Sequence, residues 1–345
     1  MSVAVALSGG ADSLLALSLL QEQGCKPVAF HASFWGSKSR EHLLQEELAA
    51  VCARMGVSFH RLDLRGVFDR EVVQPFIRDY ARGLTPNPCA WCNRRIKFKA
   101  LMRAVLDLGL TRMATGHYAG LVEHCPSPPG LFRGCDRDKD QSYFLALVGR
   151  EHLKAAHFPL AEWTKDQVHA ELAKRGLYPV SGRESQEICF IPDNDYRAFL
   201  AAQDICLPGE GKIVDVHGRT LGRHQGLHRY TVGQRRGLGI AYSEPLYVLA
   251  KDMGSNTLVV GPRRQLQAAS CRVRLTNALV EPEYWPQHLW VQTNYRQAPG
   301  PVRVGIQEKD ILVSFEQPRT PGSPGQIAVF YSEQGRVLGG GEIHV

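Results

Sequence analysis

The sequence predicts an α/β protein that begins with a doubly wound parallel sheet and continues into a β-rich second half. In the first half, short apolar runs at residues 3–7, 27–31 and 58–63 alternate with helical patterns at residues 11–23, 42–56 and 97–109. Strands separated by helices are typical of a parallel sheet. After about residue 205, β-rich runs alternate with Gly and Pro, at residues 247–251, 257–260, 289–295, 311–315 and 327–331. This texture is typical of small antiparallel sheets or a barrel.

Length and composition place the chain among ordinary globular proteins. Its 345 residues exceed one typical core, so we expect two or three domains, with a break near Gly261-Pro262. The 44% hydrophobic and 22% charged residues exclude disordered, collagen-like and coiled-coil classes. No window approaches the roughly 18 consecutive apolar residues of a membrane span. The first residues lack a basic segment, so we expect no signal peptide and a cytoplasmic protein without a membrane partner.

The charge distribution indicates the class of binding partner, and the cysteines indicate the redox compartment. The net charge is +7, and residues 205–345 hold 16 Lys and Arg, 13 of them Arg, against 11 acidic residues. The planar guanidinium group suits phosphate, so this excess favours a nucleic-acid partner, although a merely basic enzyme would look similar. Nine Cys indicate a reducing compartment, where thiols serve as metal ligands, reactive groups or core residues.

The segment SGGADS, residues 8–13, follows the first predicted strand and opens the first predicted helix. Backbone N–H groups and a helix N-terminus at such a turn can face an anion, and Ser8 and Ser13 add hydroxyl groups. The segment lacks the Lys of the Walker A loop and the spacing of G-x-G-x-x-G. It resembles the PP-loop of enzymes that split ATP into AMP and pyrophosphate, whereas an ordinary capped turn is the alternative.

Two further segments carry cysteines in patterns that could do chemistry. Cys89 and Cys92 form a C-x-x-C pair, which can share a metal, exchange as a dithiol or be incidental. Arg94, Arg95 and Lys97 follow it, and a helix beginning near Arg94 would set its positive end close to Cys92, so we expect a lowered thiol pKa there. Cys189 lies in an apolar run, where a Cys is more often a packing residue.

With these segments in place, the chain resembles the tRNA-specific 2-thiouridylase family from its first strand to its last. The matching segments, in order, are SGGADS, TPNPCAWCNRRIKFKAL, ATGHYA, DKDQSYFL, SQEICFIP, YTVGQRRGLGI, PLYVLAKD, PGQIAVFY and LGGGEI. The resemblance implies a Rossmann-like PP-loop domain over residues 1–204, a small β-rich middle domain over residues 205–266 and a C-terminal β-barrel over residues 267–345. It also implies ATP-dependent 2-thiolation of the wobble uridine, position 34, in tRNA anticodons.

The resemblance further implies a binding role for residues in three groups. The ATP site would comprise Ala6, Leu7, Ser8, Gly9, Gly10, Ala11, Asp12, Ser13, Ala32 and Gly116. The target base would contact Asn87, Pro88 and Cys89. Other parts of the tRNA would contact His117, Lys139, Asp140, Gln141, Asn294, Tyr295 and Gln326.

For the chemistry, the resemblance implies that Cys189 carries sulfur as a persulfide and that Cys92 helps to release it through a transient Cys92–Cys189 disulfide. The sulfur donor would be a cysteine desulfurase or a sulfur-relay protein. Adenylation turns the C2 oxygen of uridine into a good leaving group, and Mg²⁺ would stabilise the departing pyrophosphate. Asp12 is a candidate neighbour of that Mg²⁺, with helix capping as the alternative.

The sequence departs from the family pattern at Ala32, at Asn294 and at Cys89, where many relatives carry Asp. Cys89, Cys92 and Cys189 could together ligate a [4Fe–4S] cluster, but we favour a cluster-free enzyme that uses Cys92 and Cys189. Two other readings stay open at this point. The chain could be a PP-loop ligase or amidotransferase acting on a small metabolite, or a non-enzymatic tRNA-binding or iron–sulfur storage protein.

Overall fold

The computed structural model describes residues 2–122, 130–181, 187–308 and 310–344. The chain forms two compact units. One comprises Met1–Val73, Pro88–Phe190 and Gln334–Val337, and the other comprises Gln74–Asn87, Ile191–Glu333 and Leu338–Val345. No helix among the described residues is both long and apolar enough to cross a membrane.

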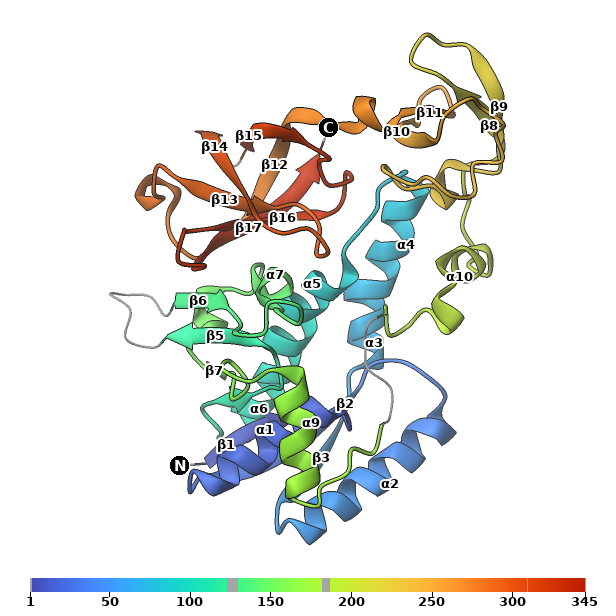
Figure 1. The fold of residues 1–345 in the computed structure, drawn as a ribbon. Helices are drawn as coiled ribbons and strands as arrows, with labels where there is room; N and C mark the ends of the chain where they lie inside the picture. Colours follow the sequence, from blue (N-terminus) through green and yellow to red (C-terminus); the bar gives the residue numbers. More distant parts are fainter. Residues whose placement is uncertain (1, 123–129, 182–186, 309, 345) are drawn as a thin grey trace. The chain divides into compact units, whose positions relative to one another are not determined.

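The first unit is built on a five-stranded parallel sheet, as the sequence predicts (Figure 1). Its strand order is β3-β2-β1-β4-β7. Going along the chain, the strands are β1 (Ser2–Ala6), β2 (Lys26–Ser33), β3 (Ser58–Asp63), β4 (Met113–Ala114) and β7 (Ala156–His157). Because β2 and β3 lie on one side of β1 and β4 and β7 on the other, the strand order reverses between β1 and β4. In open α/β sheets, ligands bind at this point, beyond the carboxyl ends of the strands.

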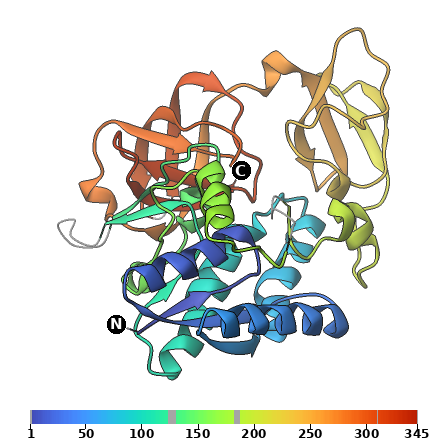
Figure 2. The ribbon, with the colours of Figure 1, turned by 60° about the horizontal axis from the view of Figure 1, so that its bottom comes forward.

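Helices α1 (Ala11–Glu22) and α2 (Lys38–Arg54) lie on one face of this sheet (Figure 2). Leu17 and Leu20 of α1 share a buried cluster with Leu48 of α2 and with Val5 of β1. Burial of such side chains stabilises the domain by roughly 1.5–3 kcal/mol each. Gly24, with φ +75°, follows the end of α1 in the left-handed conformation that glycine adopts without strain. The remaining face of α1 packs on α9 (Lys165–Lys174).

The connection from β3 to β4 ends in a continuous helical run, residues 88–107, that begins earlier than the sequence predicts. We predicted a helix over residues 97–109, but helical structure begins at Pro88. The run comprises α5 (Pro88–Cys92), η2 (Asn93–Leu101) and α6 (Met102–Asp107). Two earlier helical elements of the same unit follow β3, namely α3 (Arg65–Phe68) and η1 (Asp69–Val73). Proline suits a first helical position because its missing N–H would have no partner there. The C-x-x-C pair is therefore helical.

The other elements of the first unit are short. A two-stranded antiparallel sheet pairs β5 (Ala119–Val122) with β6 (Gly130–Arg133). The short helices α7 (Ser142–Leu145) and α8 (Arg150–Leu153) then lead to β7. Arg133 N–H donates to the carbonyl oxygen of Gly335, which ties residues 334–337 to this unit.

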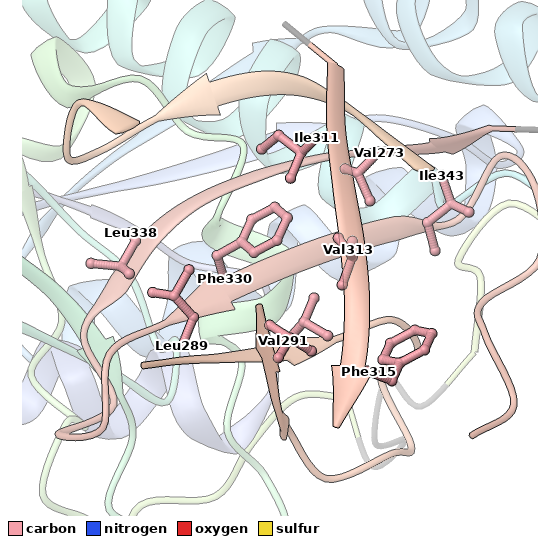
Figure 3. Packing of buried hydrophobic residues seen from close by; sticks show 11 residues of the cluster. Val273, Leu289, Val291, Ile311, Val313, Phe315, Phe330, Leu338 and Ile343 are labelled. Atoms are coloured by element: carbon pink, nitrogen blue, oxygen red, sulfur yellow. The ribbon is translucent and has the colours of Figure 1, made fainter. Parts of the chain in front are cut away.

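The second unit contains a closed six-stranded barrel with the strand order β12-β15-β14-β13-β16-β17. Its strands are β12 (Ala268–Ala278), β13 (Leu289–Gln292), β14 (Gly300–Gln307), β15 (Asp310–Arg319), β16 (Ile327–Tyr331) and β17 (Val337–His344). Alternate side chains point inward and fill the barrel, among them Val291, Val313 and Phe330 (Figure 3). This confirms the C-terminal β-barrel.

The second unit also contains a four-stranded sheet with the order β10-β11-β8-β9. Its strands are β8 (Gly211–Val214), β9 (Thr220–His224), β10 (Leu246–Asp252) and β11 (Thr257–Pro262). The helical elements of this unit are α4 (Gln74–Ala81), η3 (Pro192–Asn194), α10 (Tyr196–Ala201), η4 (Leu227–Arg229), η5 (Arg263–Leu266) and η6 (Pro282–Tyr284). Tyr80 of α4 stacks on Tyr196 of α10 at a centroid distance of 4.9 Å, which joins residues 74–87 to this unit.

Candidate active site

The SGGADS segment lies at the carboxyl end of β1, where the strand order of the sheet reverses. Its turn is closed by its own hydroxyl groups: Ser8 N–H donates to Ser13 Oγ at 3.1 Å, and Ser13 Oγ donates to the Gly10 carbonyl oxygen at 3.0 Å. Gly9, with φ +90°, occupies a conformation that favours glycine. The Ser13 hydroxyl group therefore shapes the turn, and Gly10 precedes α1 without a side-chain cap.

Gly116 lies directly against this turn, at the end of the segment that follows β4. A Cβ atom added at Gly116 would lie 2.7 Å from the Asp12 carbonyl carbon and 2.8 Å from the Ser13 nitrogen. Ordinary van der Waals contacts are 3.4–4 Å, so only glycine fits without a shift of the backbone. The structure thus brings the two segments that were assigned to ATP from the sequence into contact, and Ala32 lies half-buried in neighbouring β2.

Asp12 is held by Lys165, which lies in no quoted motif, and by Tyr118, which lies in the ATGHYA segment but was given no role from the sequence. Lys165 Nζ lies 2.8 Å from Asp12 Oδ1 and 3.0 Å from Oδ2, and the Tyr118 hydroxyl group donates to Oδ1 at 2.6 Å. The N-cap residue of α1 is Gly10, and Asp12 lies in the first turn of the helix. Since 153 residues separate Asp12 from Lys165, no local pattern could have revealed the pair.

A polar network lies between the ends of β1 and β2 and the start of α2. His31 Nδ1 lies 2.8 Å from the Leu7 carbonyl oxygen, and its Nε2 lies 2.7 Å from Glu41 Oε1. Burial opposes ionisation of Glu41, but hydrogen bonds from Ser33 and His31 and the electrostatic effect of His31 outweigh it and lower the carboxyl pKa. The network, which no motif predicted, holds the strand beside the SGGADS turn.

The three candidate thiols gather in the first unit. Burial raises the pKa of Cys89 to about 11 and that of Cys92 to about 12, and the proximity of Cys189 adds to both increases. Cys189 is solvent-exposed, although desolvation by its surroundings still raises the pKa of its thiol. Lys97 opposes the increase at all three. The structure thus places Cys92 and Cys189 close enough to influence each other.

The prediction of a lowered thiol pKa at Cys92 is wrong, for two reasons. Cys92 ends α5 instead of preceding a helix N-terminus, and it is 9% exposed. Of the three following cations, Arg94 donates to the Leu147 carbonyl oxygen, and Arg95 stacks on Trp91 at 4.2 Å. Lys97 is engaged electrostatically with Cys92, and in the π-helical η2 it lies about one turn after that residue.

An aromatic cluster fixes the chain beside Cys189. Phe190 is 1% exposed and packs edge-on against Phe68, at a centroid distance of 5.6 Å, and against Trp35, at 6.1 Å. Phe34 stacks on Phe68 at 5.6 Å. Phe34 and Trp35, which follow closely on the departure from the family pattern at Ala32, therefore anchor the segment that carries Cys189. Ser185 and Gln186 of that segment lie outside the described residues.

Several residues assigned to tRNA contact already have partners within the folded chain. His117 is 8% exposed, its Nδ1 lies 2.7 Å from Thr115 Oγ1, and its Nε2 lies 3.5 Å from Lys97 Nζ. Burial and the Lys97 charge hold the pKa of His117 well below its usual range, so its ring is neutral. The buried Asp140 carboxylate accepts hydrogen bonds from Arg133 and from the Gly134 and Ser142 N–H groups.

The other residues of that group are placed as follows. Gln141 Oε1 accepts from the Tyr118 N–H at 3.0 Å, and Lys139 is half-buried. In the second unit, Asn294 and Tyr295 are exposed on the turn after β13. Gln326 Nε2 donates to the Thr85 carbonyl oxygen at 3.0 Å and so holds the chain that leads to the buried Asn87. Pro88 is buried at the start of α5.

The described residues contain no group of three His, Cys, Asp or Glu side chains arranged to hold a metal ion. Cys89, Cys92 and Cys189 are therefore not arranged as such a group in this structure. The other described cysteines have no motif, and they range from buried to exposed: Cys25, Cys52, Cys135, Cys206 and Cys271. Cys125 lies outside the described residues.

Comparison with known proteins gives a consistent picture along the whole chain. Residues 1–193 match the family model described as tRNA methyl transferase HUP domain, residues 198–262 the tRNA methyl transferase PRC-barrel domain, and residues 268–343 the aminomethyltransferase beta-barrel domain. The chain is 50% identical to the tRNA-specific 2-thiouridylase MnmA of Nitratidesulfovibrio vulgaris strain Miyazaki F, over 99% of both chains. Relatives of the same name from N. vulgaris strain DP4 and from Oleidesulfovibrio alaskensis are each 47% identical, again over 99% of both chains.

Proposed function

Because this chain belongs to the tRNA-specific 2-thiouridylase family, we propose that it catalyses the ATP-dependent 2-thiolation of the wobble uridine in tRNA anticodons. The observation that supports this most strongly is that one unit holds both parts of such a site, the glycine-lined turn at the switch point and the paired thiols. A ligase or amidotransferase of small metabolites would need the turn but not the thiols. Full-length similarity to 2-thiouridylases does not favour that alternative.

The turn and the Gly116 segment would hold the ATP phosphates. Backbone N–H groups at the start of α1 would face an anion bound there, and the absence of a side chain at Gly116 lets its segment lie against this turn. The uridine C2 oxygen would attack the α-phosphorus, and pyrophosphate would leave. Mg²⁺ usually accompanies such phosphates, but both Asp12 oxygens contact Lys165, so we assign it no described side chain and route no step through it.

Sulfur transfer would then use two thiols. A cysteine desulfurase or a sulfur-relay protein delivers sulfur to the exposed Cys189, forming a persulfide. The terminal sulfur attacks C2, and AMP leaves with the original C2 oxygen. The Cys92 thiolate then attacks the Cys189 sulfur, so the S–S bond breaks, its electron pair stays on the sulfur bound to C2, and a Cys92–Cys189 disulfide forms. A dithiol reductant restores both thiols.

The positive charge of Lys97 would allow the Cys92 thiolate to form near neutral pH. Since burial raises the pKa of Cys92 to about 12, its thiolate needs a nearby positive charge, and Lys97 is the cation that opposes this increase. The neutral ring of His117 lies next to Lys97 without competing with that charge. We therefore assign His117 to positioning Lys97, in addition to the tRNA contact expected from the sequence.

Nucleoside mass spectrometry tests the proposal. Unmodified tRNA would be incubated with the protein, ATP, a cysteine desulfurase, cysteine and a dithiol, then digested to nucleosides. We expect 2-thiouridine with ATP and none with a non-hydrolysable α,β-analogue. The absence of 2-thiouridine when persulfide is demonstrably delivered to Cys189 would refute the proposal, and pyrophosphate release with a small acid in place of tRNA would favour the ligase.

A further inference from the structure

The proposed function requires the SGGADS turn to bind ATP, but the turn itself carries little positive charge to face the phosphates. The segment contains one acid, Asp12, and no Lys or Arg. A Walker A loop carries its own Lys for the phosphates. Here the partial positive charge of a helix N-terminus, about half an elementary charge, would face several phosphate charges and the Asp12 carboxylate. The turn itself therefore does not balance the phosphate charge, and a cation from elsewhere in the fold would add to the Mg²⁺ that accompanies ATP.

The structure places Lys165 at this point. Its ammonium group lies 2.8 Å and 3.0 Å from the two Asp12 oxygens, within the first turn of α1, and its side chain is 13% exposed. Thr164 caps α9 through a reciprocal capping box with Gln167, so Lys165 is held as the first residue of that helix. Tyr118 donates to the same carboxylate at 2.6 Å and so helps to fix its position.

The Asp12–Lys165 ion pair is not required to hold α1 and α9 together. Leu14 and Leu15 of α1 and Val168 and Leu172 of α9 already share a buried apolar cluster, which holds the two helices together. A polar pair beside such a contact adds little to stability when it is partly solvated. Its position at the SGGADS turn is instead what a phosphate site requires: the carboxylate is neutralised and the ammonium group is retained.

We propose that Lys165 is the phosphate-binding cation of the ATP site, with Asp12 and Tyr118 as the residues that position its ammonium group. The ammonium group neutralises Asp12, so that the phosphates do not meet an unpaired carboxylate, and it contacts the phosphate oxygens directly. Lys165 thus supplies across 153 residues of sequence the charge that other phosphate loops carry within the loop.

Binding measurements on four proteins test this inference separately from thiolation. ATP affinity would be measured by calorimetry, and adenosine affinity by competition, for the natural protein and for Lys165→Met, Lys165→Arg and Lys174→Met. The Met variant keeps an unbranched apolar side chain and removes the charge. Lys174 is the control because it lies on the same helix with its side chain 77% exposed.

We expect Lys165→Met to weaken ATP binding about 10- to 100-fold, as for loss of a charge-assisted hydrogen bond, and to leave adenosine binding within about twofold. Lys165→Arg should recover most of the ATP affinity, and Lys174→Met should match the natural protein. An equal loss for ATP and adenosine, or no loss for ATP, would overturn the inference and leave the proposed function intact. Failure of the natural protein to bind ATP would instead contradict the proposed function.

Discussion

Replacing Gly116 by Ala should damage the ATP site with little effect elsewhere. The added Cβ would lie 2.7 Å from the Asp12 carbonyl carbon, 2.8 Å from the Ser13 nitrogen and 2.9 Å from the Asp12 Cβ. To reach an ordinary contact of 3.4 Å, the backbone at the start of α1 must move by about 0.7 Å, because two of these atoms belong to the main chain. Overpacking of this kind costs about 1–3 kcal/mol.

A displacement of that size at a phosphate turn should weaken ATP binding about 10- to 100-fold and slow adenylation further. Calorimetry with ATP and thermal unfolding would be run on Gly116→Ala and on the control Gly66→Ala. Gly66 has no atom within 4 Å of an added Cβ and does not have a positive φ, so its variant should behave as the natural protein. An ATP affinity of Gly116→Ala within twofold of the natural protein would refute the reasoning.

Three other perturbations reach different parts of the same unit. Phe190→Leu should loosen the segment beside Cys189 and slow thiolation about tenfold at unchanged ATP affinity; a parallel loss of both would contradict this. Iodoacetamide should alkylate the exposed Cys135 and Cys206 before Cys92. The alkylation rate of Cys92 should still rise at pH 10, because the pKa of its thiol is about 12. A Cys92 alkylation rate that reaches a plateau near pH 8, measured by mass spectrometry, would be inconsistent with this pKa. Asp140→Ala should leave the Gly134 and Ser142 N–H groups without their carboxylate acceptor. We expect the free energy of unfolding, measured with denaturant, to fall by about 3 kcal/mol. An unchanged unfolding midpoint would count against a stabilising role of the Asp140 carboxylate.

The parallel sheet could be predicted because its strands and helices carry local patterns. Residues 58–63 coincide with β3, and the predicted first helix differs from α1 by one residue. In contrast, β17 was missed because it contains Gly339, Gly340 and Gly341, which disfavour an isolated strand. A Cβ at Gly341 would overlap the Arg274 carbonyl oxygen, so barrel closure demands glycine there for a reason that is visible only in three dimensions.

The site was predictable where one segment carries the chemistry. The SGGADS turn and the C-x-x-C pair were singled out from their own segments, whereas the role of Cys189 was expected only from the family resemblance. The sign of the Cys92 pKa shift was wrong because local cations suggested a lowered value, whereas tertiary burial raises it. Lys165 and Tyr118 were missed for the same reason, because their role arises only from contact with Asp12 in the folded chain.

A single-turnover sulfur transfer tests the central claim most directly. The protein would be loaded with a persulfide at Cys189, separated from the sulfur donor, and mixed with ATP and unmodified tRNA. We expect up to one 2-thiouridine per loaded protein by nucleoside mass spectrometry, with matching loss of the extra sulfur from the Cys189 peptide and a Cys92–Cys189 disulfide. Formation of 2-thiouridine by Cys189→Ser at the natural rate, or retention of the persulfide while the tRNA is thiolated, would contradict the account.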